Sequence, residues 1–198
     1  MMKVEYNIPF SSAVGVFTFP CFTHEQVKEI NKEVKKNIIQ KESQIDSAQN
    51  ASKTGEFFAV SCTPLMELIH PWLYHCQQVN KKVFGYDIYW HFHLDTLNYN
   101  VYGTNSEYKW HVDASEKNIN VADTKLTCLL NLSEAPYEGG DFHTVGSDGP
   151  RNFTSGMGLV MTSLVAHKVT PVTKGERITL TYGQRALHGD KLMIQEII

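Results

Sequence analysis

The sequence lacks a long hydrophobic run, an N-terminal signal segment and an excess of basic charge. No stretch approaches the roughly 20 consecutive apolar residues that cross a bilayer, so we expect no transmembrane helix and no membrane partner. Residues 1–6 do not form the basic segment followed by an apolar one that marks a signal peptide. Lys and Arg total 18 against 21 Asp and Glu, which gives a net charge of -3. These absences favour a cytoplasmic protein and disfavour nucleic acid as a partner.

Cysteine is also scarce, and its spacing excludes two kinds of stabilising site. Cys21, Cys62, Cys76 and Cys128 are widely scattered and include no CxxC pair, unlike disulfide frameworks and zinc-thiolate sites. We therefore expect four buried, reduced thiols. The length of 198 residues and the 42% hydrophobic content suit a single domain over residues 1–198. The sequence indicates no oligomeric state.

The N-terminal part of the chain has the periodicity of helices. Apolar residues at helical spacing predict a helix over 23–41, whose first residues match a capping box. A second helical pattern covers 63–83, and Pro71 is expected to kink it or to start a new helix. The polar segment 41–56 between them is predicted to be a loop. Together these elements form a helical support region over residues 1–85.

From residue 86 on, apolar and polar side chains alternate, as in strands with one buried face. The predicted strands lie around 88–95, 97–102, 108–113, 125–132, 140–145, 157–162, 164–170 and 176–183. Many short strands separated by turn residues favour a sandwich or a jelly roll. We therefore predict a mainly β protein with N-terminal helices (α+β). Its core over 86–185 would be a double-stranded β-helix, or jelly roll, with the helices packed on one sheet.

Histidine, in contrast, is abundant, with nine residues. Three of them belong to His-x-Asp pairs, where composition alone predicts fewer than one such pair. Residues i and i+2 of a strand project to the same side, so both members of a pair can reach one metal ion. A second histidine from a distant strand completes the two-His, one-carboxylate set of non-heme iron(II) oxygenases. The three pairs are His93/Asp95, His111/Asp113 and His188/Asp190.

Two of the three pairs lack a suitable partner. No histidine follows His188. The pair His93/Asp95 is followed by His143, but the Gly- and Pro-containing segment 145–151 carries no strand that would return a basic residue to the metal.

The pair His111/Asp113 has a better partner in His167. A short turn follows His167, and Arg177 then begins the next predicted strand. A dicarboxylate cosubstrate that chelates the metal at one end needs a cation for its far carboxylate, and a guanidinium binds both oxygens of that group. Thr179 lies two residues further on the same face, where its hydroxyl can donate a hydrogen bond.

Four segments of the sequence carry a family resemblance. They read YGTNSEYKWHVD at 102–113, LLNLS at 129–133, EGGDF at 138–142 and HKVTPVTKGER at 167–177. In this order and spacing they resemble the prolyl 4-hydroxylase-like branch of the 2-oxoglutarate/iron(II) dioxygenases. The resemblance spans roughly residues 97–183, and the N-terminal half shares only the general layout of the family.

The resemblance implies an iron site and a cosubstrate pocket. The Fe(II) ligands it implies are His111, Asp113 and His167. The cosubstrate residues it implies are Arg177, which would hold the distal carboxylate of 2-oxoglutarate, with Thr179, Tyr102 and Thr127. Some relatives have a tyrosine at the position of Leu129, so a threonine hydroxyl would serve here instead. Residues that would line the substrate pocket are Tyr108, Trp110 and Arg151.

The activity implied by the resemblance is hydroxylation of an amino-acid residue, by analogy a peptidyl proline. Fe(II) would be the cofactor and 2-oxoglutarate and O2 the cosubstrates, with succinate and CO2 released and ascorbate as a reductant. The polar segment 114–124 is either a plain loop or a lid over the substrate.

Two alternatives remain open at the level of sequence. The dioxygenase could act on a free amino acid, another small molecule or a nucleobase instead of a peptide or protein. The protein could also be a non-catalytic, cupin-like metal-binding module. Arg177 beside a complete ligand set speaks against that second alternative, because a mere metal binder has no need for a cosubstrate anchor.

Overall fold

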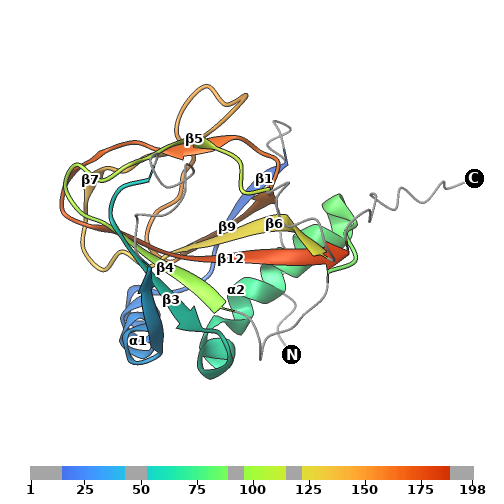
Figure 1. The fold of residues 1–198 in the computed structure, drawn as a ribbon, viewed down its shortest axis with the longest axis horizontal. Coiled ribbons are helices and arrows are strands. Elements are labelled where there is room, and N and C mark those ends of the chain that lie inside the picture. The colour runs from blue at the N-terminus through green and yellow to red at the C-terminus, as the bar shows by residue number, and fades with distance from the viewer. Residues whose placement is uncertain (1–14, 43–52, 89–95, 115–121, 188–198) are drawn as a thin grey trace, which may run out of the picture.

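The computed structural model describes residues 15–42, 53–88, 96–114 and 122–187 (Figure 1). Its strands are β1 (Val16–Pro20), β2 (Ile38–Glu42), β3 (Glu56–Ser61), β4 (Thr96–Tyr102), β5 (Tyr108–His111), β6 (Ala122–Asn131), β7 (Glu138–Gly139), β8 (Phe142–Thr144), β9 (Met157–Thr162), β10 (His167–Val169), β11 (Val172–Lys174) and β12 (Arg177–Leu187). Its helices are α1 (His24–Lys36), the short η2 (Thr63–Leu65), α2 (Met66–Val79) and the π-helical η3 (Asn80–Phe84). The fold is mainly β, as the sequence predicts.

The strands form three antiparallel sheets. The largest has seven strands in the order β1-β9-β6-β12-β4-β3-β2. A three-stranded sheet has the order β5-β10-β8, and β11 pairs with β7. The two long helices lie on one face of the large sheet, and β5 and β7 lie on its other face (Figure 1). The space between the large sheet and the smaller ones is therefore where side chains from distant strands can meet.

Helix α1 begins as predicted but ends earlier than predicted. The capping box is present, because the Thr23 N–H donates to Gln26 Oε1 at 2.9 Å and the Gln26 N–H donates to Thr23 Oγ1 at 3.4 Å. The helix ends at Lys36, and the side chain of its C-cap residue, Asn37, donates to the Glu33 carbonyl at 2.9 Å. The prediction of a helix to residue 41 was wrong at this end, because β2 pairs with β3 instead.

Helix α2 runs continuously through Pro71, so the expectation of a new helix there was wrong. Its buried face packs on β9 and β6 of the large sheet. Gly158 in β9 permits this contact, since a Cβ at that position would lie 2.9 Å from Trp72 Cδ1 and 2.5 Å from the Phe19 ring. The helix passes into η3 and stops at Gly85, which has the left-handed conformation of a helix C-cap.

Several strands differ from the prediction. The sequence does not predict β1, β2, β3, β7 or β11, and the predicted loop 41–56 includes the end of β2 and the first residue of β3. The predicted strand 108–113 ends at His111. Beyond it the backbone N–H groups of Asp113 and Ala114 donate to the Ser163 carbonyl. Most of the predicted strand 88–95 lies outside the described residues, as does most of the loop 114–124.

The core has a part on each face of the large sheet. The larger cluster joins both helices to the sheet and includes Trp72, which is fully buried. Smaller clusters around Phe142 and Tyr102 lie between the sheets. All four cysteines are free thiols, as predicted; three are buried and Cys21 is partly exposed. None of the helices in the described ranges is long and apolar enough to cross a membrane.

Candidate active site

Two strands of the three-stranded sheet bring the predicted histidines together. β5 and β10 are antiparallel, and His111 is the direct partner of His167. Asp113 follows two residues after His111, just past the end of β5. The three side chains each offer a ligand atom, and these atoms all lie within 4.8 Å of one another. The structure therefore places two imidazoles and a carboxylate around a common point.

Backbone hydrogen bonds orient both imidazole rings. His111 Nδ1 lies 2.7 Å from the Lys109 carbonyl oxygen, and His167 Nδ1 lies 2.9 Å from the Val165 carbonyl oxygen. A carbonyl oxygen only accepts, so Nδ1 of each ring donates to it and Nε2 is the ring atom that can coordinate a metal ion. Both Nε2 atoms face Asp113, at 3.4 Å from Oδ1 for His111 and 3.6 Å from Oδ2 for His167. Nε2 of His111 is buried and has no hydrogen-bond partner within the described ranges, which fits a site for a metal ion.

The protonation states also fit a cation. Burial lowers the pKa of His167, which favours the neutral ring that coordinates metals. Burial by itself would raise the pKa of Asp113, but His111, His167 and the Thr127 hydroxyl lower it to about 2. Thr127 Oγ1 donates to Asp113 Oδ2 at 2.6 Å and holds the carboxylate in place. Two imidazoles and one carboxylate suit an iron(II) ion with open coordination positions.

Tyr108 supports the site from behind. Its ring is stacked on His111, with ring centroids 3.4 Å apart and planes 15° apart. Burial raises the pKa of Tyr108 to about 12, so the phenol is protonated at neutral pH.

The three side chains line a cavity of about 490 Å³, which we call the metal cavity. The predicted site residues that line it are His111, Asp113, His167, Arg177, Thr179, Tyr102, Thr127 and Tyr108. Leu129 also lines it, at the position where some relatives have a tyrosine. Its side chain has no hydroxyl to offer there, and the Thr127 hydroxyl is bonded to Asp113.

Arg177 is a buried cation in this cavity. Only 2% of its surface is exposed, and its Nε has no hydrogen-bond partner in the part of the chain that the structure describes. The guanidinium carbon lies 5.4 Å from the centre of the Tyr102 ring and 5.8 Å from that of Phe153. Among the described residues no carboxylate forms an ion pair with it. A buried charge without a counterion is unfavourable, so the site is suited to an anionic ligand.

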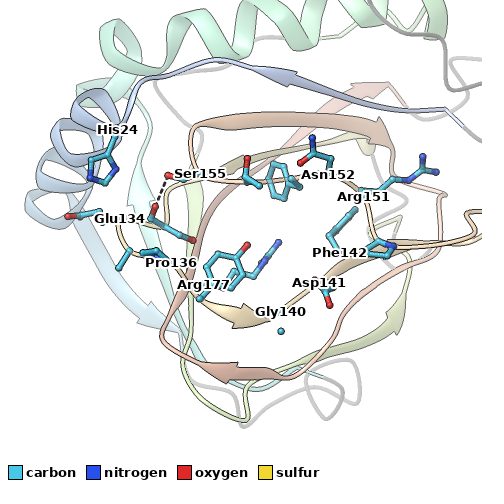
Figure 2. A pocket seen from close by; sticks show the side chains of 17 residues that line it. His24, Glu134, Pro136, Gly140, Asp141, Phe142, Arg151, Asn152, Ser155 and Arg177 are labelled. Atoms are coloured by element: carbon cyan, nitrogen blue, oxygen red, sulfur yellow. Dashed lines mark hydrogen bonds between the residues drawn. The ribbon is translucent and has the colours of Figure 1, made fainter.

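Arg177 also borders a second cavity, of about 690 Å³, which Figure 2 shows from close by. Gly140 lies beside Arg177 there. Its φ is +63°, and a Cβ at this position would be 3.0 Å from Arg177 Cδ and 3.0 Å from Val172 Cγ2. Glycine is therefore required both for this backbone conformation and for the position of the arginine.

Trp110 and Arg151 do not line the metal cavity, although the sequence predicts them in the substrate pocket. Trp110 is 52% exposed on β5, and the Lys168 ammonium lies 5.1 Å from the centre of its ring. A strand alternates its faces, so Trp110 points away from the side of the sheet that carries His111. Arg151 lines the second cavity, and its Nε donates to Thr144 Oγ1 at 2.9 Å.

The sequence did not reveal several polar side chains of the metal cavity. They are Lys53, Thr96, Asn98, Asn100, Thr124, Thr181 and Arg185. In β4, asparagines alternate with the buried Leu97 and Tyr99. This alternation could have indicated that the opposite face of the strand is polar. The competing pairs His93/Asp95 and His188/Asp190 lie outside the described residues.

Comparisons with known proteins agree with this geometry. Residues 97–182 match the 2OG-Fe(II) oxygenase superfamily. No curated protein matches the sequence.

Several solved structures with a similar fold are prolyl hydroxylases. The viral collagen prolyl hydroxylase of Paramecium bursaria Chlorella virus-1, in its 2OG complex, has a TM-score of 0.67 and 16% identity, covering 89% of this chain and 99% of that one. A Pseudomonas putida prolyl-4-hydroxylase has a TM-score of 0.60 and 16% identity, covering 88% and 94%. The Trichoplax adhaerens prolyl hydroxylase, solved with a hypoxia inducible factor peptide fragment, has a TM-score of 0.62 and 14% identity, covering 86% and 83%.

The region that matches the superfamily includes the metal cluster, by which we mean the side chains of His111, Asp113 and His167, and also includes Arg177. The similarity in fold extends over most of the chain. Fe(II), 2-oxoglutarate and O2 are the cofactor and cosubstrates of this superfamily. The superfamily match over residues 97–182 and the geometry of the site support a 2-oxoglutarate/Fe(II)-dependent dioxygenase whose fold resembles that of prolyl hydroxylases.

Proposed function

We propose that the protein hydroxylates a prolyl residue in a peptide or protein, and that residues 1–198 form one domain with a jelly-roll core. The overall reaction inserts one oxygen atom of O2 into a C–H bond and the other into succinate. 2-Oxoglutarate is oxidised and loses CO2, so atoms and electrons balance without a further reductant. The similarity in fold to prolyl hydroxylases, one of them solved with a peptide, supports this substrate class.

In this proposal His111, Asp113 and His167 hold the Fe(II) ion. The observation that carries it is the convergence of these three ligand atoms in the same cavity as the buried guanidinium of Arg177. The bound iron supplies the oxygen activation of the reaction. Thr127 holds the Asp113 carboxylate by its short hydrogen bond, and the two backbone carbonyls hold the imidazoles.

Arg177 binds the distal carboxylate of 2-oxoglutarate. The cosubstrate then serves as the counterion of Arg177. This explains why the guanidinium is buried although it forms no ion pair among the described residues. Tyr102 packs against the guanidinium, and Thr179 lies two residues along the same face of β12. Leu129 and Phe142 add apolar side chains to the lining of the same cavity.

The experiment that tests the function is turnover of 2-oxoglutarate with Fe(II) and O2, followed as succinate. A library of proline-containing peptides, with free proline and nucleotides beside it, is then screened by mass spectrometry for products heavier by one oxygen. We expect succinate and a hydroxylated peptide. Absence of any Fe(II)-dependent succinate would contradict the assignment of the site.

A further inference from the structure

One wall of the metal cavity is formed by β4 and β12, which are neighbours in the seven-stranded sheet (Figure 1). Asn100 of β4 is the direct partner of Thr179 of β12, and Asn98 is the partner of Thr181. All four residues line the cavity. Only 3% of the surface of Asn100 is exposed, so its carboxamide needs hydrogen-bond partners inside the protein.

The orientation of the Asn100 carboxamide is fixed from two sides. The Lys53 ammonium can only donate, and it donates to Asn100 Oδ1 at 3.1 Å. The Asn98 carbonyl can only accept, and it accepts from Asn100 Nδ2 at 3.1 Å. The oxygen of the carboxamide therefore faces Lys53, and its NH2 group is the side that meets β12.

The NH2 group of Asn100 donates to two threonine hydroxyls. Its Nδ2 lies 2.9 Å from Thr181 Oγ1 and 3.4 Å from Thr179 Oγ1. A hydroxyl has one proton to donate and two lone pairs with which to accept. Since each hydroxyl uses a lone pair towards Asn100, its own proton is left to donate elsewhere. Neither proton has an acceptor among the described residues, so both are available to a ligand in the cavity.

These hydroxyls extend a row of donors that begins at Arg177. Arg177, Thr179 and Thr181 alternate along β12, so they lie on the same face of the strand. A guanidinium also donates and does not accept. The ammonium of Lys53, bonded to the amide oxygen of Asn100, polarises the NH2 group and strengthens the donors beyond it. A row of donors suits a ligand whose polar atoms only accept, and the ionised carboxylates and the keto oxygen of 2-oxoglutarate are of that kind.

We propose that Asn100 is a positioning residue for the cosubstrate, and that the Thr179 and Thr181 hydroxyls that it orients donate to oxygens of 2-oxoglutarate. This inference rests on the proposed function, which assigns Arg177 and Thr179 to the cosubstrate, and it adds Thr181 and Asn100 to that site. Asn100 acts through the two hydroxyls instead of touching the cosubstrate itself. Without its NH2 group the hydroxyls are free to turn their protons away from the cavity.

An exchange of the amide for a carboxylate tests the proposal. The protein is loaded with Mn(II), a redox-stable substitute for Fe(II), and titrated calorimetrically with 2-oxoglutarate. Asn100→Asp keeps the shape of the side chain and the hydrogen bond from Lys53, but it replaces the NH2 group by an oxygen that only accepts. The threonine hydroxyls then donate to this oxygen, and their protons are withdrawn from the cavity.

Asn98→Asp is the matched control for the added charge. Asn98 lines the same wall, and its side chain has no hydrogen bond to either threonine in the part of the chain that the structure describes. We expect Asn100→Asp to bind 2-oxoglutarate at least about tenfold more weakly than Asn98→Asp does, because hydrogen bonds to a charged ligand are lost. Equal affinities of the two variants overturn the proposal.

The threonines are tested directly, which decides the proposal even if Asn100→Asp does not fold. Thr179→Val and Thr181→Val remove the hydroxyls with little change in volume, and each should weaken 2-oxoglutarate binding at least about tenfold. Thr179→Ser and Thr181→Ser keep a hydroxyl and should keep most of the affinity. In the protein with both valines, Asn100→Asp should cause no greater loss than Asn98→Asp, because no hydroxyl is left to orient. Wild-type affinity in either valine variant overturns the proposal.

Metal affinity separates positioning of the cosubstrate from a general structural role. Within the described ranges no hydrogen bond joins Asn100, Thr179 or Thr181 to the metal cluster, so Mn(II) should bind the valine variants as it binds the wild type. A parallel fall in the affinities for Mn(II) and 2-oxoglutarate assigns these residues to the fold and overturns the proposal.

Failure of this inference can be told from failure of the proposed function. Wild-type protein that binds 2-oxoglutarate no better than the valine variants do, but still binds it in the presence of Mn(II), keeps the proposed function and loses this inference. Wild-type protein that binds Mn(II) but no 2-oxoglutarate loses the proposed function itself.

Discussion

His111 and His167 face each other on adjacent antiparallel strands, with their ring centroids 4.1 Å apart. Each ring is held through Nδ1 by a carbonyl two residues earlier in the chain. The backbone therefore orients both Nε2 atoms before a metal arrives. Such a site needs little rearrangement on binding, because most of the ordering is already part of the fold.

Removing one ligand should abolish metal binding without unfolding the domain. In His167→Ala and Asp113→Ala we expect that Mn(II), used as a redox-stable substitute for Fe(II), no longer raises the unfolding temperature. For the wild type, metal at 100 times its dissociation constant should add about 2.7 kcal/mol to the free energy of unfolding. Circular dichroism checks that the fold is kept.

His143→Ala is the control for these variants, because His143 lies on the neighbouring strand β8 and does not line the metal cavity. It should keep the metal-dependent rise in unfolding temperature. Wild-type metal binding by His167→Ala would show that the ion is held elsewhere.

The Thr127 hydroxyl should contribute to metal affinity through Asp113. Thr127→Val removes the hydrogen bond to Oδ2 with little change in volume. We expect the dissociation constant for Mn(II) to rise about tenfold or more, the usual effect of losing a partner of a metal ligand. Thr127→Ser keeps a hydroxyl and should restore most of the affinity. Equal affinities of the Val and Ser variants would mean that the hydrogen bond does not orient Asp113.

The sequence predicts the metal cluster and the arginine because both follow local rules. Strand β12 alternates Arg177 and Thr179 with the buried Ile178 and Leu180, so its polar face could be read directly. His167 could be matched with the pair His111/Asp113 because a turn and that strand follow it. The structure adds that Asp113 lies beyond the end of β5, where a loop hydrogen bond rather than strand alternation sets its position.

Residues that depend on long-range pairing could not be predicted. Lys53 reaches the metal cavity because it bridges to Tyr108, far along the chain, and because β3 pairs with β4. The local sequence there is polar and reads as a loop. Trp110 was expected in the substrate pocket but is exposed on the surface. Its neighbour His111 points to the site, and adjacent residues of a strand point to opposite faces.

Cys21 should react slowly with alkylating agents in the folded protein. Burial raises the pKa of its thiol from 9.0 to about 12, although a hydrogen bond from the Gly158 backbone opposes this. The folded state therefore disfavours the thiolate. As a result, the contribution of the buried thiol to the free energy of unfolding falls as the pH rises from 9 towards 12. We expect the rate of carbamidomethylation at Cys21 to increase about tenfold per pH unit up to pH 10. In urea-unfolded protein the rate should level off near pH 9, and a similar plateau in the folded protein would contradict the raised pKa.

Gly140→Ala should disturb the cosubstrate site as well as the fold. The left-handed backbone at this position costs a residue with a Cβ about 1–2 kcal/mol, and the new methyl group would press on Arg177. We expect a lower unfolding temperature together with weaker binding of 2-oxoglutarate by calorimetry. Gly103→Ala is the matched control, since its φ is not in the left-handed region and no atom lies within 4 Å of the added Cβ. Loss of stability with unchanged 2-oxoglutarate affinity would show that the contact with Arg177 has no role in binding.

Replacing Arg177 should separate cosubstrate binding from stability. Arg177→Met keeps much of the apolar stem but removes a charge that is buried without an ion pair among the described residues. Loss of a hydrogen-bonded charge pair typically costs about 2–5 kcal/mol, so the affinity for 2-oxoglutarate should fall by at least about 30-fold. The unfolding temperature of the ligand-free protein should stay the same or rise, because an apolar residue is easier to bury than an unpaired cation. Only the wild type should then gain stability from added 2-oxoglutarate. A variant that is less stable without ligand but still binds 2-oxoglutarate normally would assign Arg177 to the fold instead of the cosubstrate.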